Sequence, residues 1–470
     1  MTSSLLIRTF KQLSAKDRRA MRDFVRCSMF NHRDDVSRLC DYLVAHVDKP
    51  VHKAFEPERL HEAAYPGKSF DNKQLRHVMS YLLDTLRKYL AVAEWQKDEA
   101  EQKRCLVRAL RNRGLDHLFE KEWQRADIAS EENPARDARY HFRRYQLHQE
   151  NLEHTARRER SVRLNLQPLP DELTNFYVAE MLRHACMARM HQAVAGQSYR
   201  IDLLKVILEA AGQDEMLQIP AVAVYFHAYR MLESPEDGEP FERLKTLLAE
   251  HESRFAPEEM RGLYLMAING CIRRMNAGNR HYIREAFDLY KAALARDFLT
   301  ENGVLSGFTY KNIIRLAVAL DEYPWAAQFL ERYRESLHTS ESDNMYRYNR
   351  AYLYFQLHDY SRAMPLLQQV DLADPLNNLD ARRMLLRSYY ELGEREALES
   401  LIQSFSAYLR RQKNLGYHRV TNENLLLFTK KMLELNNGDA AAITMLKAEI
   451  NATPDVAERA WLLERLGGKK

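Results

Sequence analysis

The chain has 470 residues, of which 46% are hydrophobic and 29% charged. This length exceeds one ordinary compact core and indicates two or three domains or an elongated array. Its 15 Gly and 14 Pro fall below the average usage of about 7% and 5%, which disfavours turn-rich sheet folds, so we expect an all-α protein without strands. The 70 basic and 66 acidic side chains leave a net charge of +4, which permits a nucleic-acid partner without indicating one.

Cysteine spacing and the length of apolar runs help to predict the cellular compartment of the protein. The five cysteines stand singly and never form a CxxC pair, which disfavours a disulfide framework and a thiolate zinc site; we expect them to be reduced and buried. No apolar run approaches the roughly 18 residues of a membrane span. Near the start, the apolar run from Leu5 to Ile7 is too short for a signal-peptide core. We therefore expect a cytoplasmic protein without membrane contact.

Residues 1–95 are expected to form a separate N-terminal helical module. Ser14 and Asp17 resemble a capping box at the start of a helix with an apolar stripe. A second helix is expected over 33–47, and prolines after it favour short helices. The strongest helical pattern in the chain, with apolar residues at spacings of three and four, covers 71–95.

Residues 96–170 are expected to form long charged helices, either a connector or the start of an array. The segment 133–166 is predicted to be one helix with an Asn-Pro start signal. Its arginines alternate with Tyr140, Phe142 and Tyr145, a pattern suited to phosphate contact and base stacking. The candidate nucleic-acid contacts are Arg136, Arg139, Arg143, Arg144, Arg157 and Arg158, followed by Arg160 and Arg163. Acidic residues of the preceding helix are positioned to neutralise this run: Glu120, Glu122, Asp127, Glu131 and Glu132.

In residues 171–470 helical patterns follow one another at short intervals, which favours antiparallel helix pairs. Four alanines recur here at spacings of 40, 37 and 34 residues: Ala286, Ala326, Ala363 and Ala397. Each is followed four residues later by a large apolar side chain, namely Tyr290, Leu330, Leu367 and Leu401. A small residue is needed where two helices approach closest, so this spacing predicts stacked helix pairs.

The passage Tyr352-Leu-Tyr-Phe-Gln-Leu-His-Asp-Tyr-Ser-Arg-Ala363 resembles the YxxLGDYxxA passage of the tetratricopeptide repeat, with His358 in place of its glycine. Weaker versions end at Ala326 and Ala397, and the alanine spacings bracket the period of about 34 residues of this family. The resemblance covers about residues 280–410. It implies a right-handed α-solenoid of antiparallel helix pairs, a superhelix that binds a partner polypeptide on its concave face.

The resemblance also implies which residues line that groove, because the first helix of each repeat faces it. These positions are Lys311, Arg315, Met345, Tyr348, Tyr352, Phe355, Arg383, Arg387 and Tyr390. Arginine and tyrosine side chains at such positions suit an extended peptide with carboxylates. The alternative interpretation is that the arginines form a solvated face and the tyrosines pack against the adjacent repeat.

Catalytic motifs are missing from the sequence. Pro66-Gly67-Lys68-Ser69 ends like a phosphate-binding loop, but the required glycine is replaced by Glu62. There is no HExxH, GxGxxG, GxSxG or calcium-loop pattern. We therefore expect a non-enzymatic protein-interaction scaffold without cofactor or metal. Its expected partner is a protein or peptide, and the basic groove residues favour an acidic one. The alternative is a nucleic-acid-associated regulator that uses the basic N-terminal or arginine-rich helices, and the third option is an enzyme whose site the linear sequence does not show.

Overall fold

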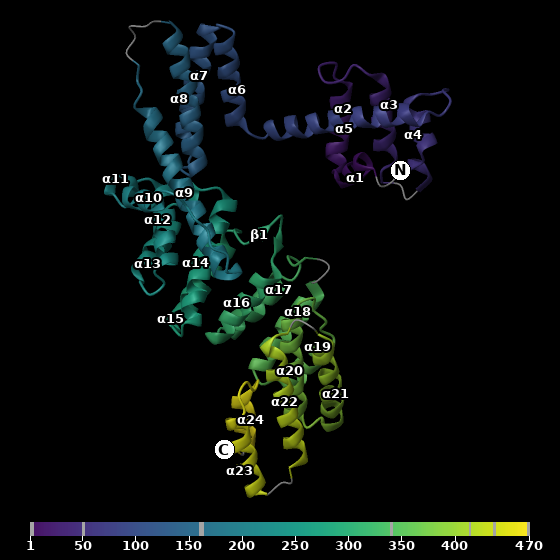
Figure 1. The fold of residues 1–470 in the computed structure, drawn as a ribbon, viewed down its shortest axis with the longest axis vertical. Coiled ribbons are helices and arrows are strands. Elements are labelled where there is room, and N and C mark those ends of the chain that lie inside the picture. Colours follow the sequence, from purple (N-terminus) through teal and green to yellow (C-terminus); the bar gives the residue numbers. More distant parts are fainter. Residues whose placement is uncertain are drawn as a thin grey trace. The chain divides into compact units, whose positions relative to one another are not determined.

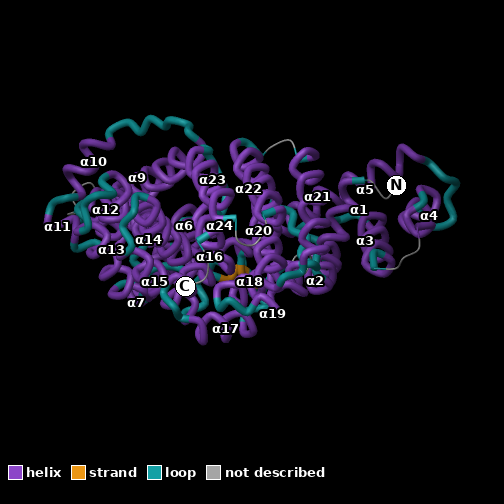
Figure 2. Tube along the Cα trace, turned by 90° about the horizontal axis from the view of Figure 1, so that it is seen from below, coloured by secondary structure: helices purple, strands orange, loops and turns teal. Residues whose placement is uncertain are grey.

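The computed structural model describes residues 4–48, 52–158, 164–338, 342–412, 415–435 and 439–467. Within them the regular structure is helical (α1 to α24) apart from one hairpin, as Figure 2 shows in purple and orange, so the predicted all-α class is confirmed. The hairpin, β1 (Thr300–Glu301) and β2 (Val304–Leu305), was not predicted. It forms because Asn302 and Gly303 both adopt positive φ, 53° and 78°, the backbone that a two-residue hairpin turn requires.

The chain divides into two compact units. The first unit comprises Met1–Pro134 and Ala138–Phe176, and the second comprises Ala135–Asp137 and Tyr177–Lys470. The finer division expected at residues 95 and 170 stays a prediction. No helix in the described ranges is both long and apolar enough to cross a membrane.

The first unit begins with five helices around one core. They are α1 (Leu5–Gln12), α2 (Ala15–Arg26), α3 (Asp34–His46), α4 (Pro57–Ala64) and α5 (Asn72–Trp95), with a short 3-10 turn at His52–Phe55. The predicted cap is present, since Ser14 Oγ accepts from the Asp17 N–H at 3.0 Å. Helix α1 was missed, although its apolar residues at spacings of one, three and four join the same core: Leu6, Ile7 and Phe10.

Three further helices of this unit are α6 (Glu99–Asn112), α7 (Asp116–Glu132) and α8 (Ala138–Arg158). The prediction of one helix over 133–166 was wrong at both ends. The N–H of Arg136 donates to the Arg254 carbonyl at 2.7 Å instead of continuing a helix from Pro134. Residues 164–166 are not helical, and α9 (Pro168–Ala195) starts at the first of two prolines, which fits because proline is tolerated in a first helical turn.

The second unit is built from consecutive helices that pack on their neighbours (Figure 1). After α9 they are α10 (Leu204–Ala211), α11 (Asp214–Leu217), α12 (Pro220–Glu233), α13 (Glu239–Glu250), α14 (Pro257–Asn276), α15 (His281–Ala295), α16 (Gly307–Ala319), α17 (Tyr323–Arg332), α18 (Ser342–Gln356), α19 (Tyr360–Leu367), α20 (Pro375–Leu392), α21 (Arg395–Arg411), α22 (Tyr417–Glu434), α23 (Ala440–Ala452) and α24 (Arg459–Leu466). A 3-10 turn covers Glu252–Arg254. Alternate helices also touch, in the pairs α10–α12, α12–α14, α16–α18, α18–α20 and α22–α24.

The four alanines lie on the second helices of successive pairs, α15, α17, α19 and α21. Ala286, Ala326 and Ala363 are fully buried, as the close approach of helices requires. The expectation for Ala397 holds only in part. It is half-buried, because the neighbouring Leu398 takes the buried position of α21.

The turns inside these pairs share one geometry. Each contains a residue with φ in the left-handed region: Gly278, Asp321, His358 and Gly393, at 94°, 58°, 58° and 73°. In each turn the following residue donates its N–H to the carbonyl five residues earlier, at 3.1, 2.9, 2.9 and 2.9 Å. This is the hydrogen bond of a Schellman helix end. The turn therefore repeats even where the sequence does not keep glycine.

Candidate functional site

The predicted groove residues lie on α16, α18 and α20, the first helices of three consecutive pairs. We call them the basic–aromatic face: Lys311, Arg315, Tyr348, Tyr352, Phe355, Arg383, Arg387 and Tyr390. The helices bring these residues together through side-chain contacts that run from α16 to α20, while Met345 is buried beneath them against Gly307.

Asp380 on α20 is the hub of one half of this face. It forms an ion pair with Arg315, accepts from the Tyr348 hydroxyl at 2.6 Å and lies 2.9 Å from Arg383 Nη2. Burial alone would raise the pKa of Asp380, but Arg315 and the Tyr348 hydroxyl hold that pKa below its ordinary value. The carboxylate is thus charged and orients side chains from three helices.

Arg315 is held over aromatic rings. Its guanidinium carbon lies 3.6 Å from the centroid of the Tyr352 ring, and Nη2 donates to the Tyr348 hydroxyl at 2.7 Å. Burial alone would lower the pKa of Arg315, but Asp380 raises it above the ordinary value. Stacking on tyrosine and pairing with a carboxylate fix the plane of this cation.

Glu458, the residue before α24, is the hub of the other half. Its Oε2 accepts from Arg387 Nη1 at 2.8 Å, and its Oε1 lies 3.9 Å from Arg383 Nε. The Arg387 guanidinium also lies 4.6 Å from the Phe355 ring centroid and 5.5 Å from that of Trp461. The C-terminal helix therefore covers part of the predicted groove.

Lys311 differs from the arginines because it makes no ion pair with a described residue. Its Nζ donates to the neutral amide oxygen of Asn377 at 2.8 Å. Burial and then the nearby Arg315 charge lower the pKa of Lys311. The amine is half-buried with an amide where a carboxylate would stabilise it better.

These contacts match neither sequence interpretation completely. Tyr348 and Tyr352 are buried against neighbouring helices, as the second interpretation expected. The three arginines are not a plain solvated face, since all of them bind carboxylates of this chain. Sequence reasoning missed Asp380, Glu458 and Trp461. Asp380 precedes Arg383 by one helical turn and could have been found, whereas nothing local connects Glu458 to Arg387, which lies 71 residues before it.

Two arginines of the arginine-rich helix α8 are neutralised by acidic residues. Arg143 pairs with Asp98, and Arg144 pairs with Asp127 and, at 3.4 Å, with Glu131. The expected neutralisation by α7 is therefore present for these last two acids.

The remaining candidates on this segment are in different situations. Arg139 and Arg157 are exposed and form no ion pair with a described residue, while Arg136 contacts Ala135 and the loop at Arg254. The side chain of Arg158, the last residue of α8, lies outside the described part, as do Arg160 and Arg163. The structure thus leaves two of the predicted nucleic-acid contacts open to solvent.

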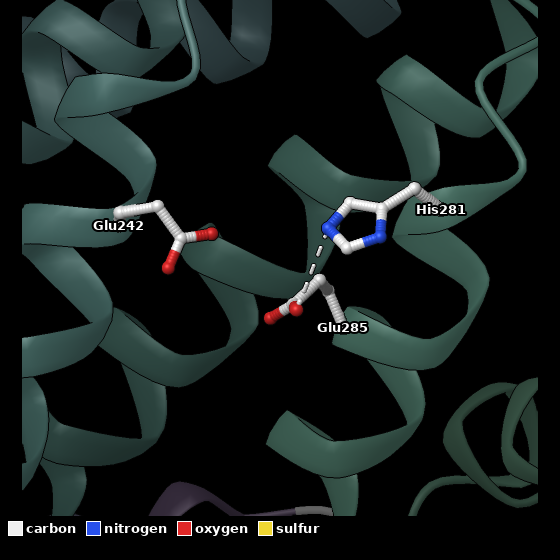
Figure 3. Close-up of side chains that lie close together, drawn as sticks. All are labelled: Glu242, His281 and Glu285. Atoms are coloured by element: carbon white, nitrogen blue, oxygen red, sulfur yellow. Dashed lines mark ion pairs between the residues drawn. The ribbon is translucent and has the colours of Figure 1, made fainter.

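One group of side chains in the described ranges has metal-ligand spacing (Figure 3). Glu242 extends from α13 toward His281 and Glu285 of α15, and one ligand atom of each lies within 4.8 Å of the others. Lys245 Nζ lies 2.8 Å from Glu242 and 2.7 Å from Glu285. Although burial would lower the pKa of Lys245, these two carboxylates raise it. The ammonium bridges both acids, so a divalent cation would have to displace it.

A cavity of about 230 Å³ lies between α9 and α12, lined by residues that include Arg189, Gln192, Tyr199 and Tyr229. Its cation is engaged, because Arg189 Nη2 donates to the Tyr229 hydroxyl at 3.2 Å and lies 3.5 Å from Glu233. The lining holds no pair of nucleophile and base.

The thiols are free, as expected. Burial raises the pKa of Cys40 and of Cys271 to about 12, so these groups stay protonated and inert. The expectation that all five are buried was wrong for Cys27, which is exposed, and Cys105, which is half-buried.

Comparison with known protein families, with curated proteins and with solved structures finds no match to this chain.

Proposed function

We propose that the protein is a non-enzymatic interaction scaffold that binds an acidic segment of a partner polypeptide on the basic–aromatic face. In this proposal the helix pairs form a right-handed, tetratricopeptide-like solenoid. The buried alanines and the repeated turns with left-handed backbone support this arrangement. No cofactor is needed, because the face binds by charge and by aromatic area.

The observation that carries the proposal is Lys311. This face holds only two carboxylates, Asp380 and Glu458, for four positive charges. The four cations are Lys311, Arg315, Arg383 and Arg387. The cation without an ion pair to a described residue is the half-buried amine of Lys311, whose pKa is lowered chiefly by burial, although the more distant Asp374 and Asp380 act in the opposite direction. A partner carboxylate at Lys311 would complete the pairing and would be bound by a charge-assisted hydrogen bond.

Selection of displayed random peptides on the full chain tests this. We expect the selected peptides to be enriched in Asp and Glu and to weaken with salt. Lys311→Gln should reduce their affinity about tenfold, the factor that corresponds to one charge-assisted hydrogen bond. The fold should persist, because the glutamine amide can still donate to Asn377.

Lys205→Gln is the matched control, since this lysine on α10 is exposed and far along the chain from the face. Selection without acidic enrichment, or equal loss of affinity in both variants, would contradict the proposal.

A second candidate, nucleic-acid binding by the N-terminal module, is favoured by the distribution of charge. Residues 1–95 hold 17 Lys and Arg against 12 Asp and Glu, whereas residues 96–470 hold 53 against 54. Lys73, Arg76 and Lys88 are exposed along α5. Binding of short single- or double-stranded DNA or RNA that falls steeply with salt would support this candidate, and no binding at low salt would remove it.

A further inference from the structure

Helices α20 and α24 carry complementary charges along their shared contact. On α20, Arg383, Arg387 and Glu391 follow one another at four-residue spacing. On α24, Glu458 lies against the two arginines and Arg465 Nε lies 3.0 Å from Glu391 Oε1. The acid of each helix thus meets the base of the other, while α24 also packs on α22 and α23.

Trp461 lies between these two pairs. Its Nε1 donates to Glu391 Oε1 at 2.8 Å, its ring packs at 83° against Tyr390 with centroids 5.2 Å apart, and Arg387 covers it. The tryptophan is 3% exposed. An acid, a tryptophan and a base at positions i, i+3 and i+7 therefore contact three positions of α20 that follow one another at four-residue spacing, Arg383, Arg387 and Glu391.

The segment 455–458, which ends at Glu458, has unfavourable backbone geometry. Glu458 and Asp455 both have φ in the left-handed region, 54° and 52°, without being glycine. The intervening chain is tied to α22, because the Ala457 N–H donates to the Thr421 carbonyl at 3.0 Å. A helix that carried the same acid within a regular turn would avoid this strain.

We propose that this side of α20 is a binding site for a partner helix carrying an acid, a tryptophan and a base at positions i, i+3 and i+7, and that α24 is its intramolecular occupant. The proposal rests on the proposed function in that both place a partner segment on the basic–aromatic face. A partner must displace α24, so its apparent affinity is reduced by the fraction of chains in which the site is closed. The strain at Glu458 lowers that barrier.

The probe for this test is a fluorescein-labelled peptide with the sequence of residues 455–467. Its binding to the full chain is measured by fluorescence anisotropy. Glu458→Gly in the full chain removes the carboxylate while glycine tolerates the same φ, so the chain should fold while its own α24 is held less firmly. Adding Trp461→Ala loosens α24 further. Circular dichroism monitors the fold of each variant.

We expect the Glu458→Gly chain to bind the probe about tenfold tighter than the unchanged chain, the factor that corresponds to one lost charge-assisted hydrogen bond. The second substitution should tighten binding again. A chain with both Arg387→Glu and Glu458→Arg is the matched control: it keeps an internal ion pair between α20 and α24, and it should not bind the probe.

Equal probe binding by the unchanged and Glu458→Gly chains, or no binding by folded Glu458→Gly, would overturn the inference and show α24 to be a permanent part of the fold. The proposed function is separable from this result. If the probe binds as expected but peptide selection shows no acidic enrichment, the proposed function fails and the α24 site remains. If peptide selection shows acidic enrichment but the Glu458→Gly chain binds the probe no more tightly than the unchanged chain, the proposed function stands and the α24 inference fails.

Discussion

Carboxylates that bind several arginines organise both units at the scale of single residues. In the second unit Asp380 contacts Arg315 and Arg383. In the first unit Glu150, 2% exposed, lies 2.6 Å from Arg108 Nε and 2.8 Å from Arg111 Nη2. Because removing one member of such a group leaves a desolvated charge without its partner, these residues should matter more for stability than surface ion pairs do.

Asp380→Asn tests this with a defined pH dependence. The folded pKa of Asp380 lies below its ordinary value of 3.8, so its stabilisation is present above about pH 4 and is lost as the pH falls through the lower folded pKa. At pH 7 we expect the variant to lose about 2 kcal/mol of unfolding free energy. The difference in Tm between the two chains should be constant from pH 5 to 8 and shrink below pH 3.8.

The control is Asp343→Asn, whose carboxylate is exposed and pairs with Arg334 at 3.0 Å. It should change stability by less than about 0.5 kcal/mol. An effect of Asp380→Asn no larger than that of the control would show that Asp380 does not organise the face.

At the scale of elements, helix ends were the least predictable part of the chain. Apolar spacing located both ends of α3 and of α5 to within about two residues. It could not show that the Arg136 N–H bonds to Arg254, which delays α8. The turn at His358 looked like a departure from the repeat, yet its backbone adopts the left-handed conformation that glycine favours. Helix packing on both sides imposes that geometry on an unfavourable residue.

We therefore expect His358→Gly to stabilise the protein by about 1 kcal/mol, because glycine takes φ of 58° without strain. Denaturant unfolding would measure the change. The reciprocal variant Gly393→Ala should cost about 1 kcal/mol through the backbone alone, since an added Cβ would meet no atom within 4 Å. A destabilising His358→Gly would mean that the contact of its ring with the Tyr360 hydroxyl, at 2.9 Å, outweighs the strain.

For the whole molecule, the division into two compact units predicts separable unfolding. The side chains of the α1 to α5 core all come from residues 6–93, whereas Ala363 is buried in the second unit. Each unit should therefore respond to substitutions in its own core.

Ala363→Arg should destabilise the second unit by more than the roughly 1–3 kcal/mol of overpacking, because it also buries a charge. Scanning calorimetry should show the transition of this unit lowered and that of the first unit unchanged. Leu82→Ala in the α1 to α5 core should do the opposite, by about 2–5 kcal/mol. Ala397→Arg is the control, and its cost should be smaller because Ala397 is half-buried. One transition that moves with both core variants would contradict two independent units.

The sequence by itself determined the helical class, most helices and the positions of Ala326 and Ala363 at buried contacts, because these depend on local spacing and side-chain size. It also identified the residues of the basic–aromatic face. Only the tertiary structure decided which side chains contact that face. Glu458 meets Arg387 across 71 positions, and Lys311 receives an amide instead of an acid. Such pairings depend on how distant helices pack, for which a linear pattern carries no signal.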